Sequence, residues 1–133
     1  MRTMTVSGEG WSTATLDDLG DGPGFRKVRK TLGVEAFGVN AIVLPAGIET
    51  GFHWHDEQDE LYFVHAGEIE MEFGDGTRQT LAAGAFAHVS APTHRKIRNT
   101  GDGDAVYVVV GAKDGYVGRD GRAPEGTQRV SES

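Results

Sequence analysis

The chain of 133 residues contains no cysteine. Without thiols it has no disulfides, iron-sulfur clusters, thiolate metal sites or cysteine nucleophiles, so its chemistry rests on imidazole, carboxylate and hydroxyl groups. A long apolar run is also absent: the stretch AVYVVVGA at 105–112 is far too short to cross a bilayer, and the N-terminal residues show no signal-peptide pattern. We therefore expect a cytoplasmic protein that does not enter a membrane.

Basic residues are outnumbered by acidic ones, 13 against 20, and the formal net charge is −7. Nine of the acidic residues lie between Glu49 and Asp75, in a window without Lys or Arg. That window would repel a phosphate backbone, and the small basic clusters at 26–30 and 95–98 are too mixed for a nucleic-acid footprint. The charge pattern favours a small-molecule substrate or ligand over nucleic acid.

Glycine is abundant, with 20 residues, and short segments of period-two alternation lie between the glycines. In GEIEMEFG, for example, Ile69, Met71 and Phe73 share one face while the intervening glutamates share the other. One domain of all-β structure is expected, as a sandwich, jelly roll or small closed barrel. The expected strands are 38–44, 61–64, 68–73, 79–81, 85–89, 96–99 and 105–111.

The segment from Gly47 to Gly67 carries the chemistry. His53 and His55 stand two residues apart, so on an extended strand both imidazoles project from one face. Glu60 follows the polar loop DEQD, which breaks the strand and lets the next one begin with Glu60 facing inward. Two imidazoles and one carboxylate with open positions are typical of non-haem Fe(II) oxygenases and also suit other transition metals.

The spacing Gly-x5-His-x-His-x4-Glu-x6-Gly in this segment resembles the first motif of the cupin family at every fixed position. The resemblance implies an all-β cupin-type jelly-roll β-barrel (a double-stranded β-helix) with one divalent transition metal (Fe, Mn, Zn, Ni or Co) and a tendency to form a homodimer. We expect one cupin domain over residues 1–133. Its motif-bearing core is about 41–110, its N-terminal arm and first strands are 1–36, and its C-terminal tail is 111–133.

The second cupin motif is where the sequence departs from the family. In GAFAHVSAPTHRKIRNTG, from Gly84 to Gly101, keeping both ends in register puts Arg95 where the family has its ligand histidine. His94 then stands one residue early, and strand parity turns it to the opposite face.

Three arrangements remain open. A bulge near Pro92 would bring His94 inward as a fourth ligand. Alternatively, His53, His55 and Glu60 hold the metal alone, and Arg95 turns away or grips an anionic substrate. In the third arrangement Arg95 pairs with Glu60 and replaces the metal, which leaves a polar binding pocket.

Other residues near the motif have simpler interpretations. Tyr62 shares the face of Glu60, so its hydroxyl is expected either to touch a substrate or to pack. Trp54, between the two histidines, is expected to face away from the metal. His65 is expected on the surface, and His88 is interpreted as a core histidine bonded to a carbonyl rather than a ligand. The segment GYVGRDG at 115–121 has no assigned role beyond a turn-rich arm that packs on the barrel or on a neighbouring subunit.

The sequence thus predicts a metal-binding cupin that acts on a small organic molecule by dioxygenase-type or isomerase-type chemistry. The alternative is a non-catalytic small-molecule-binding or sensing cupin, possible without metal if Arg95 pairs with Glu60 or with an anionic ligand.

Overall fold

A computed structural model of the chain describes residues 5–113, 115–118 and 120–124. Strands dominate these residues, and the only helices among them are the 3-10 turn η1 (Asp17–Leu19) and the short α1 (Val28–Leu32). The prediction of an all-β fold is confirmed. The strands are β1 (Val6–Gly8), β2 (Trp11–Thr13), β3 (Gly24–Arg26), β4 (Gly38–Leu44), β5 (Trp54–His55), β6 (Asp59–Ala66), β7 (Glu68–Phe73), β8 (Arg78–Ala82), β9 (Phe86–Val89), β10 (Arg95–Asn99), β11 (Ala105–Ala112) and β12 (Gly121–Arg122).

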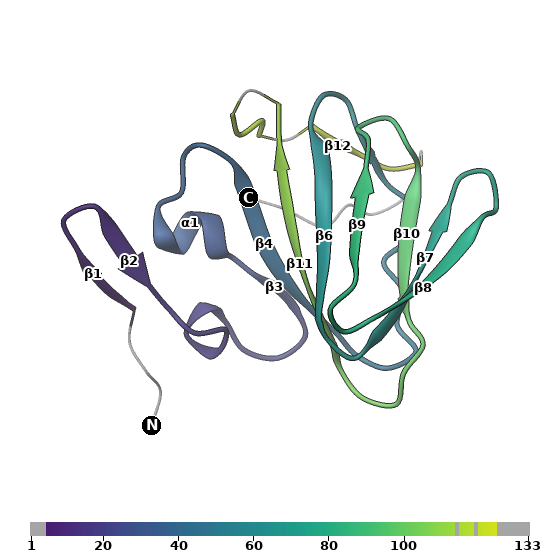
Figure 1. Cartoon of the computed structure of the whole chain (residues 1–133), viewed down its shortest axis with the longest axis horizontal. Helices are drawn as coiled ribbons and strands as arrows, with labels where there is room; N and C mark the ends of the chain where they lie inside the picture. The colour runs from purple at the N-terminus through teal and green to yellow at the C-terminus, as the bar shows by residue number, and fades with distance from the viewer. Residues whose placement is uncertain (1–4, 114, 119, 125–133) are drawn as a thin grey trace.

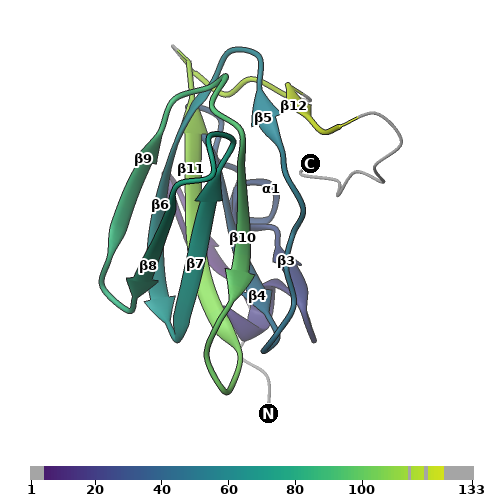
Figure 2. The same ribbon diagram turned by 90° about the vertical axis from the view of Figure 1, so that its right-hand side faces the viewer.

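Two antiparallel sheets form the body of the molecule. One has the strand order β3-β4-β11-β6-β9 and the other has the order β10-β7-β8. Figure 1 shows the strands of the larger sheet lying side by side across the molecule, and Figure 2 shows the smaller sheet in front of the larger one. The hairpin β1-β2 and the pair β12-β5 complete the strand pairing of the described residues.

The core lies between the two sheets and is built from inward-facing positions of both. On β7, Ile69 and Met71 are fully buried, whereas the glutamates that alternate with them are partly exposed, as period-two alternation predicts. Each fully buried side chain of this size stabilises the fold by about 1.5–3 kcal/mol. The buried cluster comprises Ile42, Leu44, Tyr62, Val64, Ile69, Met71, Val89, Ile97, Ala105 and Tyr107.

The second motif glycine, Gly67, makes the tight connection between β6 and β7. Its backbone has φ +78°, a left-handed conformation that other residues rarely adopt. A Cβ at this position would lie 2.9 Å from the Cα of Ala105 on the neighbouring strand β11. Gly67 is therefore required for sterics at this turn, not for chemistry.

The shortest elements escape the sequence prediction. Strands β1, β2, β3, β5 and β12 have two or three residues each, too few to show a period. β6 begins at Asp59, so Glu60 lies inside the strand that was expected to start at 61.

No helix among the described residues is long and apolar enough to span a membrane.

The C-terminal segment crosses back over the motif. β12 pairs with β5 so that Gly121 lies opposite His55 and Arg122 opposite Trp54. The backbone N–H of Asp56 also donates to the carbonyl of Asp120 (3.1 Å). Residues 120–122, whose role the sequence leaves unassigned, are thus hydrogen-bonded to the strand that carries His55.

Candidate functional site

His53 and Arg95 lie directly opposite each other on neighbouring backbone segments. The N–H of His53 donates to the carbonyl of Arg95 (2.9 Å), and the N–H of Arg95 donates to the carbonyl of His53 (3.0 Å). Directly paired residues of antiparallel segments project to the same face, so this register turns Arg95 inward with His53. The backbone therefore places a guanidinium where the cupin pattern has a histidine.

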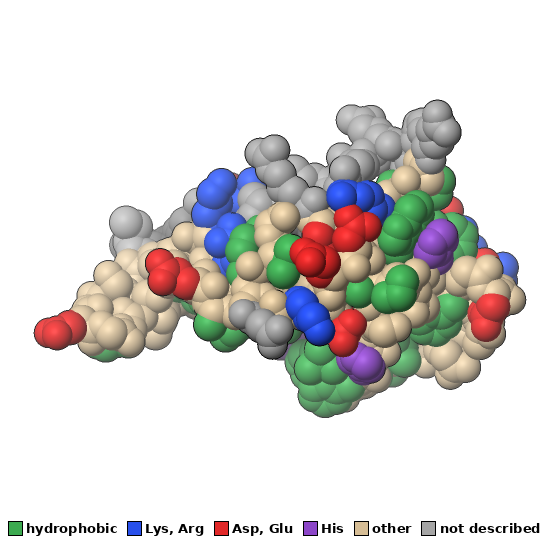
Figure 3. Space-filling model, turned by 90° about the horizontal axis from the view of Figure 1, so that it is seen from above, with side chains coloured by type: hydrophobic (Ala, Val, Ile, Leu, Met, Phe, Trp, Pro, Cys, Tyr) green, Lys and Arg blue, Asp and Glu red, His purple; other side chains and the backbone are tan. Residues whose placement is uncertain are grey.

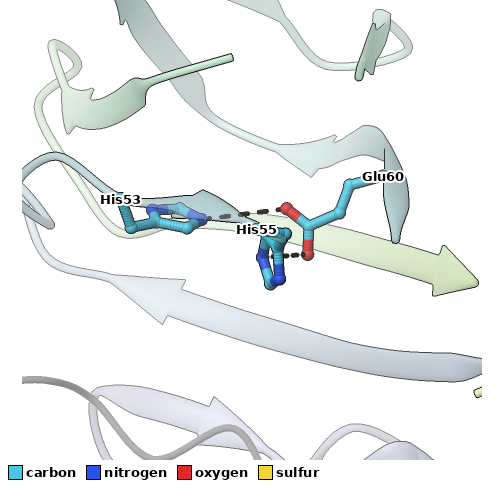
Figure 4. Close-up of side chains that lie close together, drawn as sticks. All are labelled: His53, His55 and Glu60. Carbon is cyan, nitrogen blue, oxygen red and sulfur yellow. Dashed lines mark ion pairs between the residues drawn. The ribbon is translucent and has the colours of Figure 1, made fainter. Parts of the chain in front are cut away.

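The structure brings His53, His55 and Glu60 together, as Figure 4 shows. His55 Nε2 lies 3.1 Å from Glu60 Oε2, and His53 Nε2 lies 3.7 Å from Glu60 Oε1. Two ligand atoms bound to one ion at about 2.1 Å are themselves about 3 to 3.5 Å apart. One nitrogen from each histidine and one carboxylate oxygen lie within 4.8 Å of one another, so the three residues could hold a metal ion with small side-chain movements.

Asp120 is the residue that orients His55, and sequence reasoning missed it. Its Oδ1 lies 2.9 Å from His55 Nδ1, while Oδ2 accepts from the backbone N–H groups of Glu57 (2.7 Å) and Gln58 (2.8 Å). Asp120 and His55 are 65 residues apart in the chain, and both are buried. The only sequence signal was an acid within the Gly-rich segment at 115–121, which has no spacing relation to the motif.

The contact with Asp120 decides the protonation of the His55 ring. Nδ1 also lies 3.2 Å from Gln58 Nε2, but the ionised carboxylate is the closer and charged partner and only accepts hydrogen bonds, so we assign the proton to Nδ1, which donates to Asp120. The remaining nitrogen, Nε2, faces Oε2 of Glu60 at 3.1 Å. Two lone pairs at that distance repel, so a cation belongs between them: either the proton of an imidazolium or a metal ion. Carboxylate support of this kind on the far ring nitrogen is the usual arrangement behind metal-bound histidines.

Arg95 is fully buried and forms an ion pair with Glu60. Its Nη2 donates to Glu60 Oε1 (2.8 Å), and its Nε donates to the Tyr62 hydroxyl (3.3 Å). Its Nη1 donates to the carbonyls of Ala91 and Thr93. With its donors committed in this way, Arg95 does not line the cavity described below. The pairing of Arg95 with Glu60 is the contact on which the third of the arrangements left open by the sequence is based.

Tyr62 completes the contacts of the carboxylate. Its hydroxyl donates to Glu60 Oε1 at 2.6 Å and lies 3.5 Å from His53 Nε2. One carboxylate oxygen of Glu60 is thus shared by Tyr62 and Arg95, while the other faces His55. Neither Tyr62 nor Arg95 donates to Oε2.

The structure does not bring His94 into this group. Its ring stacks on the indole of Trp54, with ring centroids 4.1 Å apart and planes inclined by 7°. Both side chains point away from the histidine and glutamate cluster because each alternates with an inward residue, His53 or Arg95. His94 is therefore not placed as the possible fourth ligand. His88 was expected in the core but is 68% exposed, 3.8 Å from Asp59.

Burial and charge shift the pKa values of the acids in the site. Burial acts to raise the pKa of Glu60, but hydrogen bonds with His53 and His55 and the charge of Arg95 outweigh it and hold that pKa well below its usual range. Burial, followed by the charge of Glu60, raises the pKa of Tyr62 well above its usual value. At neutral pH Glu60 is therefore ionised, and Tyr62 remains a hydrogen-bond donor.

The cluster lies at the wall of a cavity of about 1150 Å³. His53, Glu60 and Tyr62 line this cavity together with apolar side chains of β4, β10 and β11. His55 lies behind them and is fully buried. A small molecule in the cavity would therefore reach one imidazole, the carboxylate and the Tyr62 hydroxyl.

Replacing Asp120 with alanine is expected to weaken metal binding by about 10- to 100-fold, because His55 loses the group that fixes its tautomer and ring orientation. Isothermal titration of metal-free protein measures the effect. Asp120→Asn keeps an oxygen that accepts from His55 and should lose less affinity, and Asp102→Ala, on an exposed loop, should lose none. Equal affinities for D120A and D102A would show that Asp120 does not position the ligand.

Two facing antiparallel sheets around a cavity, with His53 and Glu60 at its wall and His55 behind them, are the arrangement expected of a cupin protein. In agreement, a family model described as "Cupin domain" matches residues 40–111, which is more than half of the 133 residues. The chain belongs to the cupin family. Comparison with curated proteins finds no match.

Several solved structures are similar to the chain. A sugar phosphate isomerase of the cupin superfamily from Silicibacter pomeroyi is 28% identical over 67% of this chain and 58% of its own, with a TM-score of 0.61. A cupin protein from Bacteroides fragilis is 16% identical over 92% of both chains, with a TM-score of 0.68. A protein from Thermotoga maritima, described as a predicted oxalate decarboxylase, is 22% identical over 67% of this chain and 76% of its own, with a TM-score of 0.57. The chain thus spans less than two thirds of the isomerase, and the last two likenesses show the fold alone.

Proposed function

We propose that the protein holds one divalent transition metal through His53, His55 and Glu60 and acts on a small organic molecule in the adjoining cavity. The observation that carries this proposal is the position of His55 between two carboxylates. Its Nδ1 contacts Asp120 at 2.9 Å, and its Nε2 faces Glu60 at 3.1 Å, an arrangement that calls for a cation on the Glu60 side. The donor set of two imidazoles and one carboxylate suits Fe, Mn, Zn, Ni or Co.

A bound metal would supply Lewis-acid polarisation of an oxygen on the ligand. Side chains of the protein position the ligands and hold a proton. Asp120 holds the His55 ring in one tautomer, and Arg95 holds Glu60 ionised and in place. The Tyr62 hydroxyl, protonated at neutral pH, donates to Glu60, and Tyr62 lines the cavity.

The reaction is proposed to be of dioxygenase or isomerase type, as the sequence predicts. The similar structure from Silicibacter pomeroyi is a sugar phosphate isomerase, which supports the isomerase class. The dioxygenase class rests on the ligand set alone. Oxygen uptake by iron-loaded protein with phenolic and diketone substrates separates the two. The homodimer and the cytoplasmic location stay predictions of the sequence.

The ion pair of Arg95 with Glu60, at 2.8 Å, favours a second candidate function. The guanidinium of Arg95 already neutralises the carboxylate of Glu60. A dication about 4 Å from that guanidinium would be repelled by it by about 8 kcal/mol at an effective dielectric of 20. In this candidate the cation beside His55 is a proton, and the protein is a metal-free small-molecule-binding or sensing cupin. Both candidates use the same cavity.

Metal titration decides between the two candidates. Protein prepared without an affinity tag and stripped by a chelator is titrated calorimetrically with Mn²⁺, Co²⁺, Ni²⁺ and Zn²⁺, and with Fe²⁺ under anaerobic conditions. One ion per chain is expected, with release of protons because the cation replaces the proton of His55. No binding by a protein whose circular dichroism shows an intact fold would instead establish the metal-free candidate.

A further inference from the structure

The mouth of the cavity is lined by cations from a segment outside the cupin motif. Lys27 and the α1 residues Arg29 and Lys30 line it, together with Arg122 of β12. α1 packs beside β4 of the larger sheet. Figure 3, which looks onto the molecule from above, shows Lys and Arg side chains beside hydrophobic ones just left of the centre, with Asp and Glu side chains further to the left.

One of these cations, Arg122, pairs with Asp56, and the other three have no such partner among the described residues. The two acids that line the cavity already have cationic partners: Glu60 pairs with Arg95 (2.8 Å), and Glu49 pairs with Lys96 (3.5 Å). Within the part of the chain that the structure describes, no carboxylate forms an ion pair with Lys27, Arg29 or Lys30. The mouth is therefore positive on a protein whose net charge is −7.

Arg29 has a fixed position at this mouth. Its guanidinium carbon lies 4.0 Å from the centre of the Tyr116 ring, and both side chains line the cavity. A guanidinium that lies over an aromatic ring still has N–H groups that can donate hydrogen bonds to other partners. Lys27 and Lys30 are exposed and lie on either side of it in the chain.

The interior of the same cavity is mainly apolar. Its wall includes Phe25, Ile42, Leu44, Ile97 and Val109, together with the ring of Tyr107. Apart from the cluster around Glu60, this wall offers few hydrogen-bonding groups for a polyhydroxylated ligand. A ligand that fills it gains by placing carbon, not hydroxyl groups, against these side chains.

We propose that the cavity takes an amphiphilic organic anion: an apolar body packs against the inner wall near the cluster, and an anionic head meets Lys27, Arg29 and Lys30 at the mouth. This inference rests on the proposed small-molecule function and specifies the class of molecule. A carboxylate and a phosphate head share the required chemistry, and charge-assisted hydrogen bonds to arginine and lysine suit either. The sugar portion of a sugar phosphate does not match the apolar wall.

The test compares a probe that has an apolar body and an anionic head with a probe that has the apolar body alone. 8-Anilino-1-naphthalenesulfonate is an aromatic anion, and N-phenyl-1-naphthylamine is the same ring system without the sulfonate. Fluorescence titration of chelator-treated protein is expected to show one anionic probe per chain. K27Q/K30Q, at two exposed positions, should weaken that binding about tenfold and leave the neutral probe within about twofold.

The matched control is R78Q/R98Q, which removes the same charge from exposed positions of β8 and β10 outside the cavity lining. It should change the affinity of the anionic probe by less than about twofold. Unchanged binding in K27Q/K30Q, or equal weakening in both double variants, would overturn the proposal.

Displacement of the anionic probe identifies the head and the body of the ligand. Octanoate or octyl phosphate should displace it, and whichever is the more effective identifies the preferred head group. If glucose 6-phosphate displaced the probe as effectively as octyl phosphate does, the proposal that the ligand has an apolar body would be overturned. Because the protein is free of metal in these titrations, their failure leaves the metal-binding result unaffected, and a failed metal titration leaves this test intact.

Discussion

Metal binding is expected to disappear when His53 and His55 are replaced together by alanine. Loss of a group that merely supports a ligand costs about 10- to 100-fold, so the loss of two of three ligands should cost more than about 1,000-fold. The remaining carboxylate of Glu60, already paired with Arg95, then has no partner that could hold a dication. Calorimetric titration of the chelator-treated variant measures the loss.

The fold should survive this double substitution. His53 is 27% exposed, and its backbone bonds to Arg95 do not depend on the side chain. His55 is buried, and its loss removes one charge-assisted hydrogen bond with Asp120, which costs about 1.5–3 kcal/mol. The matched control is H65A/H88A, which removes two histidines from exposed positions. A double alanine variant that still binds one ion with the affinity of this control would place the metal elsewhere.

Replacing Glu60 with leucine is expected to lower the free energy of unfolding by about 3–5 kcal/mol. Arg95 is fully buried, and Glu60 is its only carboxylate partner among the described residues. The substitution therefore leaves a guanidinium charge in a place that water does not reach, and the Tyr62 hydroxyl loses its acceptor as well. Urea denaturation in the presence of a chelator measures the change without a contribution from metal.

A double-mutant cycle isolates the ion pair. Arg95→Met should also destabilise the protein, since Glu60 loses its cationic partner, but the double variant E60L/R95M should lose less than the sum of the two single variants. The exposed pair Arg98–Glu70, at 3.6 Å, provides the comparison: Arg98→Ala should cost less than about 1 kcal/mol. Strictly additive losses in E60L/R95M would show that Glu60 and Arg95 do not stabilise each other.

Much of the fold and the ligand set could be predicted from local rules. Alternation in β7 separates Ile69 and Met71 from the glutamates, and this pattern survives folding because one face of the strand packs on the core. The interval between His53 and His55 is short enough for the backbone alone to put both rings on one side. Family resemblance then supplies the partner strand that carries Glu60.

The position of Arg95 is a mixed case. Strand parity indicates from the sequence that Arg95 turns inward and His94 outward. What Arg95 contacts inside is a tertiary matter, because Glu60 and Tyr62 lie on β6 in the other sheet. Only the packing of the two sheets decides that the guanidinium meets a carboxylate rather than a ligand in the cavity.

By itself, the sequence determined the class of fold, the trio of candidate ligands and the outward turn of Trp54, since each depends on neighbours within a few residues. The tertiary structure alone decided that Asp120 supports His55 and that Lys27 and the helix after it line the cavity. These contacts join segments tens of residues apart, and no periodicity links such segments. Their partners are selected by the closure of the sheets and by the pairing of β12 with β5.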